Sequence, residues 1–457
     1  MNTRTRIVLL LLLGTAAAMT RPLTAQTYIP KFEKFTLRNG MHVVLHRDTT
    51  LPLISVHMVY HAGSAVDQTG RTGVANIAGE MLLLGTKNVP REELMRLRAE
   101  EQVSISAMTT VDWFGISSVF PMHLLEKAIT IEADRMQHAT ASFARERFDA
   151  IIENLREEHK KRETQAFGTL TQQIFHELYA ERHPYRHITI GERDHLDSIR
   201  FSDVRAFSAR YHVPANAYLT LAGNFDPATT RKLIERHFSG IHGGDAVGWK
   251  NIPDAFTPIG QGAIIREDRH SHNQLHLVFP TVRIGHPDEP VLRLIARLLT
   301  GSENALINMN LLRGNPLVHS VEVNQTSNEL TGTFWITVNC AMEAKLSDVY
   351  GQVMRIIADL ANRGAADAEL NAARNQAAME FYAPLELFHG FGGRGDMLNL
   401  GNLYGGTPSF HFTQFESLRD VSSASVKRAT TQYLSASNQF IVSVVPFGKA
   451  GFGVDLE

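Results

Sequence analysis

Three histidines separated by even numbers of residues, His270, His272 and His276, suggest metal chemistry. They stand near the start of a predicted strand, where alternate residues point to one face of a sheet. Imidazole is a common zinc ligand. However, no further ligand from another part of the sequence is evident. The pattern therefore favours exposed or core histidines over a metal site.

Two further features resemble chemical motifs only in part. The run Gly390-Phe391-Gly392-Gly393-Arg394-Gly395 fits Gly-x-Gly-x-x-Gly loosely, but it follows a predicted helix at residues 368–381 rather than a strand. This context favours a flexible loop over a dinucleotide site. Cys340 is the only cysteine, which excludes an intramolecular disulfide and a cysteine-based zinc site. Because it follows an apolar run at residues 334–338, we expect it to be buried.

The elements that must position such residues show two kinds of hydrophobic pattern, one typical of strands and one typical of helices. Strands are predicted at residues 53–60 and 217–222. Helices are predicted at residues 73–84, 124–136, 145–163, 169–179 and 203–211. Since the strands are grouped rather than regularly alternating with helices, the fold class is predicted to be α+β, with a largely antiparallel sheet covered by helices.

Internal similarity is the main sign of domain organisation. Short segments recur with an offset of about 220 residues: 56–60 with 275–279, 114–116 with 334–336, and 204–211 with 426–433. We therefore predict two tandem homologous domains, residues 32–242 and 259–457. A linker at residues 243–258 is indicated by its Gly, Asp, Asn and Pro content.

The first residues resemble a signal peptide. Arg4 and Arg6 precede a run of about 13 apolar residues, shorter than the roughly 20 that a membrane-spanning helix needs. We expect residues 1–25 to be removed after Ala18 or Ala25 and the chain to be exported to the periplasm. The alternative is an uncleaved anchor. No second spanning segment is predicted.

Composition argues against some partners. The 457 residues are 44% apolar and carry a net charge of −2, which becomes −5 once residues 1–25 and their three arginines are removed. This balance offers no broad basic surface for nucleic acid or anionic lipid.

Residues 73–86 carry the most specific resemblance. Gly73-Val74-Ala75-Asn76-Ile77-Ala78-Gly79-Glu80-Met81-Leu82-Leu83-Leu84-Gly85-Thr86 resembles Gly-Leu-Ala-His-x-x-Glu-His-Met-Leu-x-x-Gly-Thr, the zinc-binding helix of M16 (pitrilysin, insulinase and mitochondrial-processing-peptidase-like) peptidases. Segments 63–65, 106–112, 183–185 and 189–191 resemble other family stretches. The resemblance covers about residues 32–457.

The resemblance implies a lost active site. In the family, two His and a later Glu bind zinc, and a Glu between the two His activates the zinc-bound water. Here Asn76 and Glu80 stand at the two His positions, and Gly79 stands at the position of the base. Glu157, 77 residues after Glu80, matches the third ligand. An amide is a poor zinc ligand and glycine cannot take a proton, so we expect neither zinc nor catalysis.

Other positions are assigned by the same resemblance. Ser106 replaces the family's Asn on the strand beside the substrate, Arg313 matches an Arg near the scissile peptide, and His319 stands where the family often has Tyr. We predict that these three residues bind substrate; for Arg313 the alternative is a surface or helix-end arginine. An alternative use of Glu80 and Glu157 with Asn76 is calcium or magnesium binding, because those ions prefer oxygen ligands. The other alternative is that Glu157 is a solvated acid.

The predicted function is that of a non-catalytic subunit. In the M16 family four homologous domains enclose a peptide-sized chamber, and this chain would supply two of them to an active zinc peptidase chain. No cofactor is expected in this chain; zinc is expected only in the partner, and unfolded peptides are the expected ligand. Two alternatives stay open: a stand-alone homodimer that binds peptides or acts as a scaffold, and an active metallopeptidase with unorthodox ligands.

Overall fold

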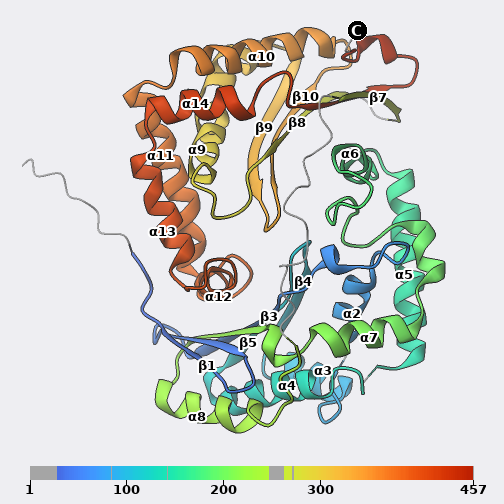
Figure 1. Cartoon of the computed structure of the whole chain (residues 1–457), viewed down its shortest axis with the longest axis vertical. Coiled ribbons are helices and arrows are strands. Elements are labelled where there is room, and N and C mark those ends of the chain that lie inside the picture. Colours follow the sequence, from blue (N-terminus) through green and yellow to red (C-terminus); the bar gives the residue numbers. More distant parts are fainter. Residues whose placement is uncertain (1–27, 84, 142, 246–261, 270–271, 456–457) are drawn as a thin grey trace, which may run out of the picture.

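The computed structural model describes residues 28–83, 85–141, 143–245, 262–269 and 272–455. The predicted signal peptide, most of the predicted linker and His270 lie outside the described residues. In the described part, the chain forms two halves, each built on one mixed sheet with helices around it (Figure 1).

The two sheets repeat one topology. The first has the order β1-β2-β6-β3-β5-β4 and the second the order β7-β11-β8-β10-β9. The only parallel neighbours described are β2 with β6 and β7 with β11, which hold equivalent places. The predicted α+β class and the tandem repeat are thus confirmed. The strands are β1 (Glu33–Thr36), β2 (His42–Arg47), β3 (Leu53–Tyr60), β4 (Ser104–Thr109), β5 (Phe114–Pro121), β6 (Ala217–Gly223), β7 (Gly262–Asp268), β8 (Asn273–Thr281), β9 (Val318–Ser327), β10 (Gly332–Cys340) and β11 (Phe440–Pro446).

The predicted helices are present, each within two residues of its expected ends. The structure also has helices that were not predicted. Taken together, the helices of the first half are α2 (Val74–Leu83), α3 (Arg91–Glu100), α4 (Leu125–Gln137), α5 (Arg145–Thr164), α6 (Leu170–Leu178), α7 (Phe201–Tyr211) and α8 (Pro227–Phe238). In the second half they are α9 (Glu289–Thr300), α10 (Leu346–Arg363), α11 (Asp367–Tyr382), α12 (Arg394–Gly405), α13 (Phe410–Glu416) and α14 (Ser423–Tyr433). Within the described residues, no helix combines the length and apolar character needed to cross a bilayer.

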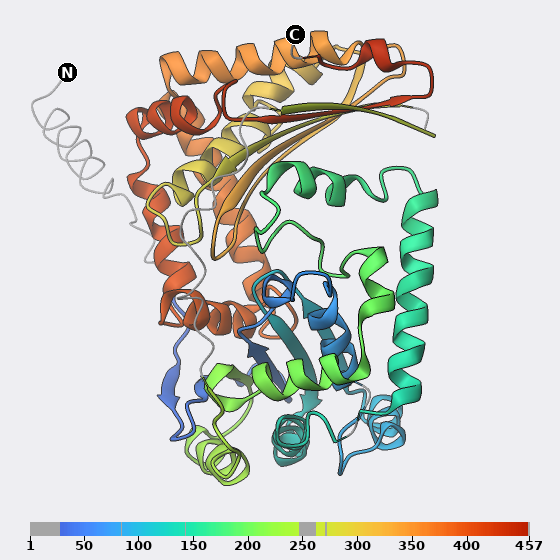
Figure 2. The same cartoon turned by 45° about the vertical axis from the view of Figure 1, so that its right-hand side comes forward.

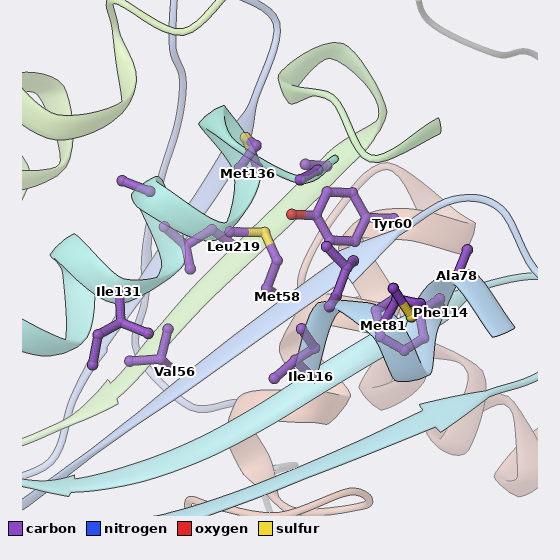
Figure 3. Packing of buried hydrophobic residues seen from close by; sticks show 14 of the residues in the cluster. Val56, Met58, Tyr60, Ala78, Met81, Phe114, Ile116, Ile131, Met136 and Leu219 are labelled. Atoms are coloured by element: carbon purple, nitrogen blue, oxygen red, sulfur yellow. The ribbon is translucent and has the colours of Figure 1, made fainter. Parts of the chain in front are cut away.

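The first sheet is covered on both faces. Along β3, the side chains of Val56, Met58 and Tyr60 point into the core that α2 and α4 close, as Figure 3 shows. The alternate residue Val59 packs instead with Leu403 of α12, a helix of the second half. This double coverage explains why β3 reads as an almost continuous apolar run.

The two halves exchange equivalent helices. The amide of Asn399 on α12 donates hydrogen bonds to the His57 and Tyr218 carbonyls of the first sheet, at 3.2 and 3.1 Å. In return, α6 of the first half packs through Leu170 and Ile174 against Val442 of the second sheet. Figure 1 shows α12 above the lower sheet and α6 beneath the upper one. Figure 2 shows α5, in blue-green, running along the side of the molecule up to α6. Each sheet therefore depends on the other half for one of its faces.

A buried carboxylate joins the tips of two equivalent hairpins. Asp112, between β4 and β5, is 1% exposed. It accepts hydrogen bonds from the Tyr185 hydroxyl, from the Tyr404 hydroxyl at 3.1 Å, and from the Glu329 amide at 2.9 Å in the turn between β9 and β10. The Leu330 amide donates to the Tyr185 hydroxyl at 3.0 Å. Burial raises the pKa of Asp112 to about 6. One side chain thus anchors the second half to the first.

Candidate functional site

The helix that carries the degenerate motif is held at its start by a buried acid. The fully buried Asp67 carboxylate accepts hydrogen bonds from the backbone amides of Gly73 at 2.7 Å and Ala75 at 2.9 Å, in the first turn of α2. Acceptors at a helix N-terminus satisfy amides that have no partner within the helix. The helix then buries its apolar face and leaves Asn76 and Glu80 half-buried, one turn apart.

Asn76 and Glu80 bind each other. The Asn76 side-chain amide donates a hydrogen bond to Glu80 Oε1 at 3.1 Å. The two positions that would need imidazole nitrogen therefore hold an amide and a carboxylate that already satisfy one another. Neither group is a nitrogen ligand of the kind that zinc sites of this type require.

Gly79 leaves no room for a side chain. A Cβ atom built at this position would lie 2.5 Å from Cε2 and 2.7 Å from Cδ2 of Phe114, closer than carbon atoms that are not bonded to each other approach. The Phe114 ring is 1% exposed and lies near the rings of Tyr60 and His212, with centroid distances of 6.4 and 5.6 Å. Figure 3 shows it beside Ala78 and Met81 of α2. The place where a catalytic carboxylate would begin is thus filled by an aromatic ring.

Glu157, the residue predicted at the third ligand position, points away from this helix. Its side chain is 64% exposed and lies 3.7 Å from the Lys160 ammonium. The buried stripe of α5 runs through Ile151, Leu155 and His159, and Glu158 continues it as a half-buried residue. Adjacent helix residues point about 100° apart, so counting from Glu80 places Glu157 on the wrong face. The carboxylate whose charge acts on Glu80 is that of Glu158.

These residues do not fit a zinc ion. The motif positions offer an amide, no side chain and a carboxylate, and no contact among the described residues brings Glu157 to Glu80. Within the same described ranges, no three His, Cys, Asp or Glu side chains gather so that they could hold a metal. We therefore derive no metal-dependent step for α2.

The surroundings of Glu80 disfavour its ionised form, and this effect can be tested by changing the pH. Burial, and then the charge of Glu158, raises the pKa of Glu80 above its ordinary 4.5. A raised pKa in the folded state contributes stability below the ordinary value, and this contribution is lost as pH rises through the folded value. Glu80→Gln keeps the acceptor for Asn76 and removes the charge. We expect a small rise in Tm at neutral pH that fades below about pH 4.5.

Thermal unfolding followed by circular dichroism, at neutral pH and below about pH 4.5, measures this difference in Tm. Glu157→Gln is the matched control, because its exposed carboxylate pairs only with Lys160 and its removal should leave Tm unchanged. A Glu80→Gln variant that is less stable than the parent at neutral pH would contradict the assignment.

Of the other residues singled out in the sequence, His272, His276 and Cys340 lie in the described part of the chain. His276 is buried, contacts Gln274 at 2.8 Å, and accepts from Trp335 Nε1 at 3.1 Å; burial lowers its pKa to about 4. His272 lies against the Phe167 ring. Cys340 is buried as predicted, and burial raises its thiol pKa to about 12.

The glycine-rich run is a loop that leads into α12. The Gly392 amide donates to the buried Asp396 carboxylate at 2.8 Å, and Gly395 lies against His57 of the first sheet. A buried carboxylate at this helix start would repel a phosphate. Residues 390–393 of the run thus form a loop, as predicted, and Arg394 and Gly395 begin α12.

Comparison with known families decides the relationship. The sequence model described as insulinase, peptidase family M16, matches residues 42–189. The one described as the peptidase M16 inactive domain matches residues 198–377. The chain belongs to the M16 peptidase family. The first match contains α2 with Asn76, Gly79 and Glu80, so these residues lie inside the matched segment rather than beyond its edge.

Relatives and solved structures agree with this M16 assignment. The chain is 22% identical over 374 residues to the zinc protease PqqE of Helicobacter pylori, covering 79% of this chain and 82% of that protein. A crystal structure of a protease from Helicobacter pylori superposes with a TM-score of 0.81 at 19% identity, covering 92% of this chain and all of that one. The periplasmic protease PqqL from Escherichia coli superposes with a TM-score of 0.73 at 16% identity. The superposed region covers 95% of this chain but only 50% of the PqqL chain.

The predicted M16 substrate positions lie on exposed edges. Ser106 is exposed on β4, the edge strand of the first sheet, and its hydroxyl donates to the Ser117 carbonyl at 3.3 Å. His319 is exposed on β9, the edge strand of the second sheet. Arg313 is exposed before β9 and lies 3.4 Å from the Asn304 side chain. No described contact joins these three to Asn76 or Glu80, and their role in substrate binding stays a prediction.

Sequence reasoning missed three residues that matter at this M16 site. Phe114 fills the space beside Gly79, Asp112 joins the halves, and Glu158 rather than Glu157 acts on Glu80. The helical phase of α5 would have identified Glu158. The other two depend on contacts between distant segments, for which the sequence carries no local signal.

Proposed function

We propose that this chain is a non-catalytic subunit of an M16-type peptidase. The observation that carries the proposal is the packing of Phe114 against Gly79, because it removes the space for the general base as well as the base itself. The hydrogen bond between Asn76 and Glu80 supports it, since both ligand positions already satisfy each other. An active peptidase with unorthodox ligands would still need a group to take a proton at this helix, and Gly79 supplies none.

Pairing with an active chain is the second element of the proposal. This chain spans only half the length of the Escherichia coli protease that shares its fold. The M16 resemblance implies four domains around a chamber, of which this chain has two. A second M16 chain, carrying zinc, would supply the other two and the chemistry.

The role assigned to this chain is to close the chamber and help hold unfolded peptide. Its first sheet ends at β4, where Ser104, Ser106 and Met108 are exposed. An edge strand presents unpaired backbone groups to which an extended peptide adds as a further strand. One of these backbone groups, the Ile105 carbonyl, already accepts a hydrogen bond from Arg98 at 2.9 Å. The proposed peptide contact is therefore the other end of β4, near Thr109.

The proposed location is the periplasm. The composition of residues 1–25 favours export, and the neighbour from Escherichia coli is itself described as a periplasmic protease. Cell fractionation with N-terminal sequencing of the mature chain tests this directly: recovery in the cytoplasmic fraction with residue 1 intact would contradict it.

Metal content and peptide cleavage test the catalytic part of the proposal. For the purified chain we expect substoichiometric zinc by elemental analysis and no cleavage of a mixed set of quenched fluorescent peptides. Mixed with an active M16 chain from the same cell, it should form a complex on gel filtration and raise that chain's activity. Stoichiometric zinc with chelator-sensitive cleavage by the chain alone would overturn the proposal, as would the absence of any complex and any effect on the partner.

A stand-alone peptide-binding homodimer is the second candidate, and the open edge of β4 favours it because peptide addition there needs no metal. Sedimentation of the isolated chain separates the two. A stable homodimer that captures unfolded peptides without an active partner supports the second candidate, whereas a monomer that binds peptide only in the mixed complex supports the first.

A further inference from the structure

A cavity of about 350 Å³ lies within the second half, remote in sequence from the degenerate motif. It is lined mainly by residues of α9, α11, α12 and α13, together with Gln325 of β9, and all of these belong to the second half. Its volume is within the range of small-molecule sites, roughly 300–1,000 Å³. The proposed subunit role gives this cavity no task.

One wall of the cavity is apolar and aromatic. The rings of Phe381 and Phe415 stack with centroids 4.3 Å apart and planes 6° apart, and Met397 and Leu418 extend the same surface. A rigid apolar wall of this kind suits a hydrocarbon or aromatic group.

Two ion pairs also line the cavity, and each oxygen of their two carboxylates already accepts from, or lies beside, a donor. Glu289 Oε1 accepts from Arg293 at 2.8 Å and Glu289 Oε2 from the Gly285 amide at 2.8 Å. Glu380 Oε2 lies 3.1 Å from Arg297 Nε, while Glu380 Oε1 accepts from Gln376 at 3.0 Å. Every carboxylate oxygen that lines the cavity thus has a partner.

The arginines, in contrast, keep unused donors. A guanidinium has five N–H groups, and each arginine commits one nitrogen to its glutamate. Arg297 is the more enclosed of the two, with 24% of its side chain exposed against 53% for Arg293. The two arginines therefore supply the cavity with hydrogen-bond donors for a ligand.

A buried histidine adds a further polar group without a partner. Nε2 of His411 is buried in the cavity wall and has no hydrogen-bond partner in the described part of the protein. Burial, and then the charge of Arg293, lowers the pKa of His411 to about 3, so the ring is neutral at physiological pH. A buried polar atom left without a partner costs free energy that a bound ligand atom recovers.

We propose that this cavity binds a carboxylate attached to an apolar or aromatic body. The carboxylate accepts hydrogen bonds from Arg297, Arg293 and His411, and the apolar body lies on Phe381 and Phe415. A free organic acid and the C-terminal residue of a peptide share this chemistry. The site is distinct from α2 and does not depend on the loss of zinc.

Binding of N-acetyl-L-phenylalanine, measured by isothermal titration calorimetry on the mature chain, tests the proposal. N-acetyl-L-phenylalaninamide has the same body without the charge, and we expect it to bind at least about tenfold more weakly, because charged acceptors make the stronger hydrogen bonds. Arg297→Gln should weaken binding of the acid by a similar factor and leave binding of the amide unchanged. His411→Asn should weaken the acid several-fold.

Arg363→Gln is the matched control: this arginine also pairs with acids, Asp359 and Glu369, but it lies at the end of α10 outside the cavity lining. It should bind the acid as the parent does. Circular dichroism confirms that each variant is folded. Failure of the acid to bind, equal binding of acid and amide, or an Arg297→Gln variant with unchanged affinity would overturn the proposal.

A final arm identifies the source of the carboxylate. A hexapeptide that ends in phenylalanine is compared with its C-terminally amidated form. Binding of the free-acid peptide, with loss on amidation, supports recognition of peptide ends. Binding of the small acid alone supports a free organic acid.

Discussion

Gly79→Glu is expected to destabilise the protein by more than about 3 kcal/mol, because it combines overpacking of a filled core with burial of a carboxylate. The Cβ atom alone would lie 2.5 Å from the Phe114 ring, and that ring is itself 1% exposed within the core. Urea unfolding followed by circular dichroism measures the loss. For the same reason, restoring Asn76→His, Gly79→Glu and Glu80→His together should yield neither stoichiometric zinc nor cleavage.

Two sets of variants isolate the cause. Asn76→His and Glu80→His change half-buried positions and should each cost less than about 1 kcal/mol. Phe114→Ala alone should cost about 3–5 kcal/mol, yet in the Gly79→Glu background its cost should be smaller, because the two changes share one space. A Gly79→Glu variant as stable as the parent, or strict additivity with Phe114→Ala, would show that the ring does not exclude the side chain.

Asp112→Ala is expected to cost about 3–5 kcal/mol and to loosen the joint between the halves. The substitution removes the acceptor of the Tyr185 and Tyr404 hydroxyls and of the Glu329 amide. A buried donor without a partner costs about 1–3 kcal/mol. Trp113 in the first half and Trp335 in the second provide fluorescence signals from each side of the joint. We expect urea unfolding to split into two transitions, and limited proteolysis to cut the variant faster than the parent.

Asp288→Ala is the matched control. Asp288 accepts from Arg428 and Tyr433, which all lie in the second half. Its loss should lower the stability of that half without changing the joint. A single, unshifted transition for Asp112→Ala, or equal splitting for Asp288→Ala, would refute the role of Asp112.

The pH dependence of the joint follows from the same carboxylate. Burial raises the pKa of Asp112 from 3.8 to about 6. The stability that Asp112 contributes through this shift is complete below about pH 3.8 and is lost as pH rises to about 6. Asp112→Asn, which cannot titrate, should flatten the stability profile between these two values.

Much of the fold followed from hydrophobic periodicity. The strand predicted at residues 53–60 and the helix predicted at residues 145–163 are β3 and α5, nearly to the residue. The recurrence at an offset of about 220 residues indicated two sheets of one topology, which the strand orders confirm. These features could be predicted because they depend on neighbours in the chain and on similarity between its halves.

Contacts between distant segments could not be predicted. An apolar face on α6 or α12 indicates burial, but not that each helix would cover the sheet of the other half. Likewise, Gly79 signals a missing base, while the ring that takes its place comes from β5. Glu157 is an exposed acid beside Lys160, one of the two alternatives that the sequence left open, whereas the charge of the adjacent Glu158 acts on Glu80. This difference depends on the phase of α5, which a residue count from the motif does not give.

The exchange of α6 and α12 gives the molecule the symmetry of a two-fold dimer within a single chain. In a homodimer, any substitution appears twice, once in each copy. Here the two copies are separate stretches of one sequence, so each has been free to diverge. Asn76, Gly79, Glu80 and the Phe114 ring belong to the first copy alone, and they lie outside the clusters through which α6 and α12 hold the two copies together.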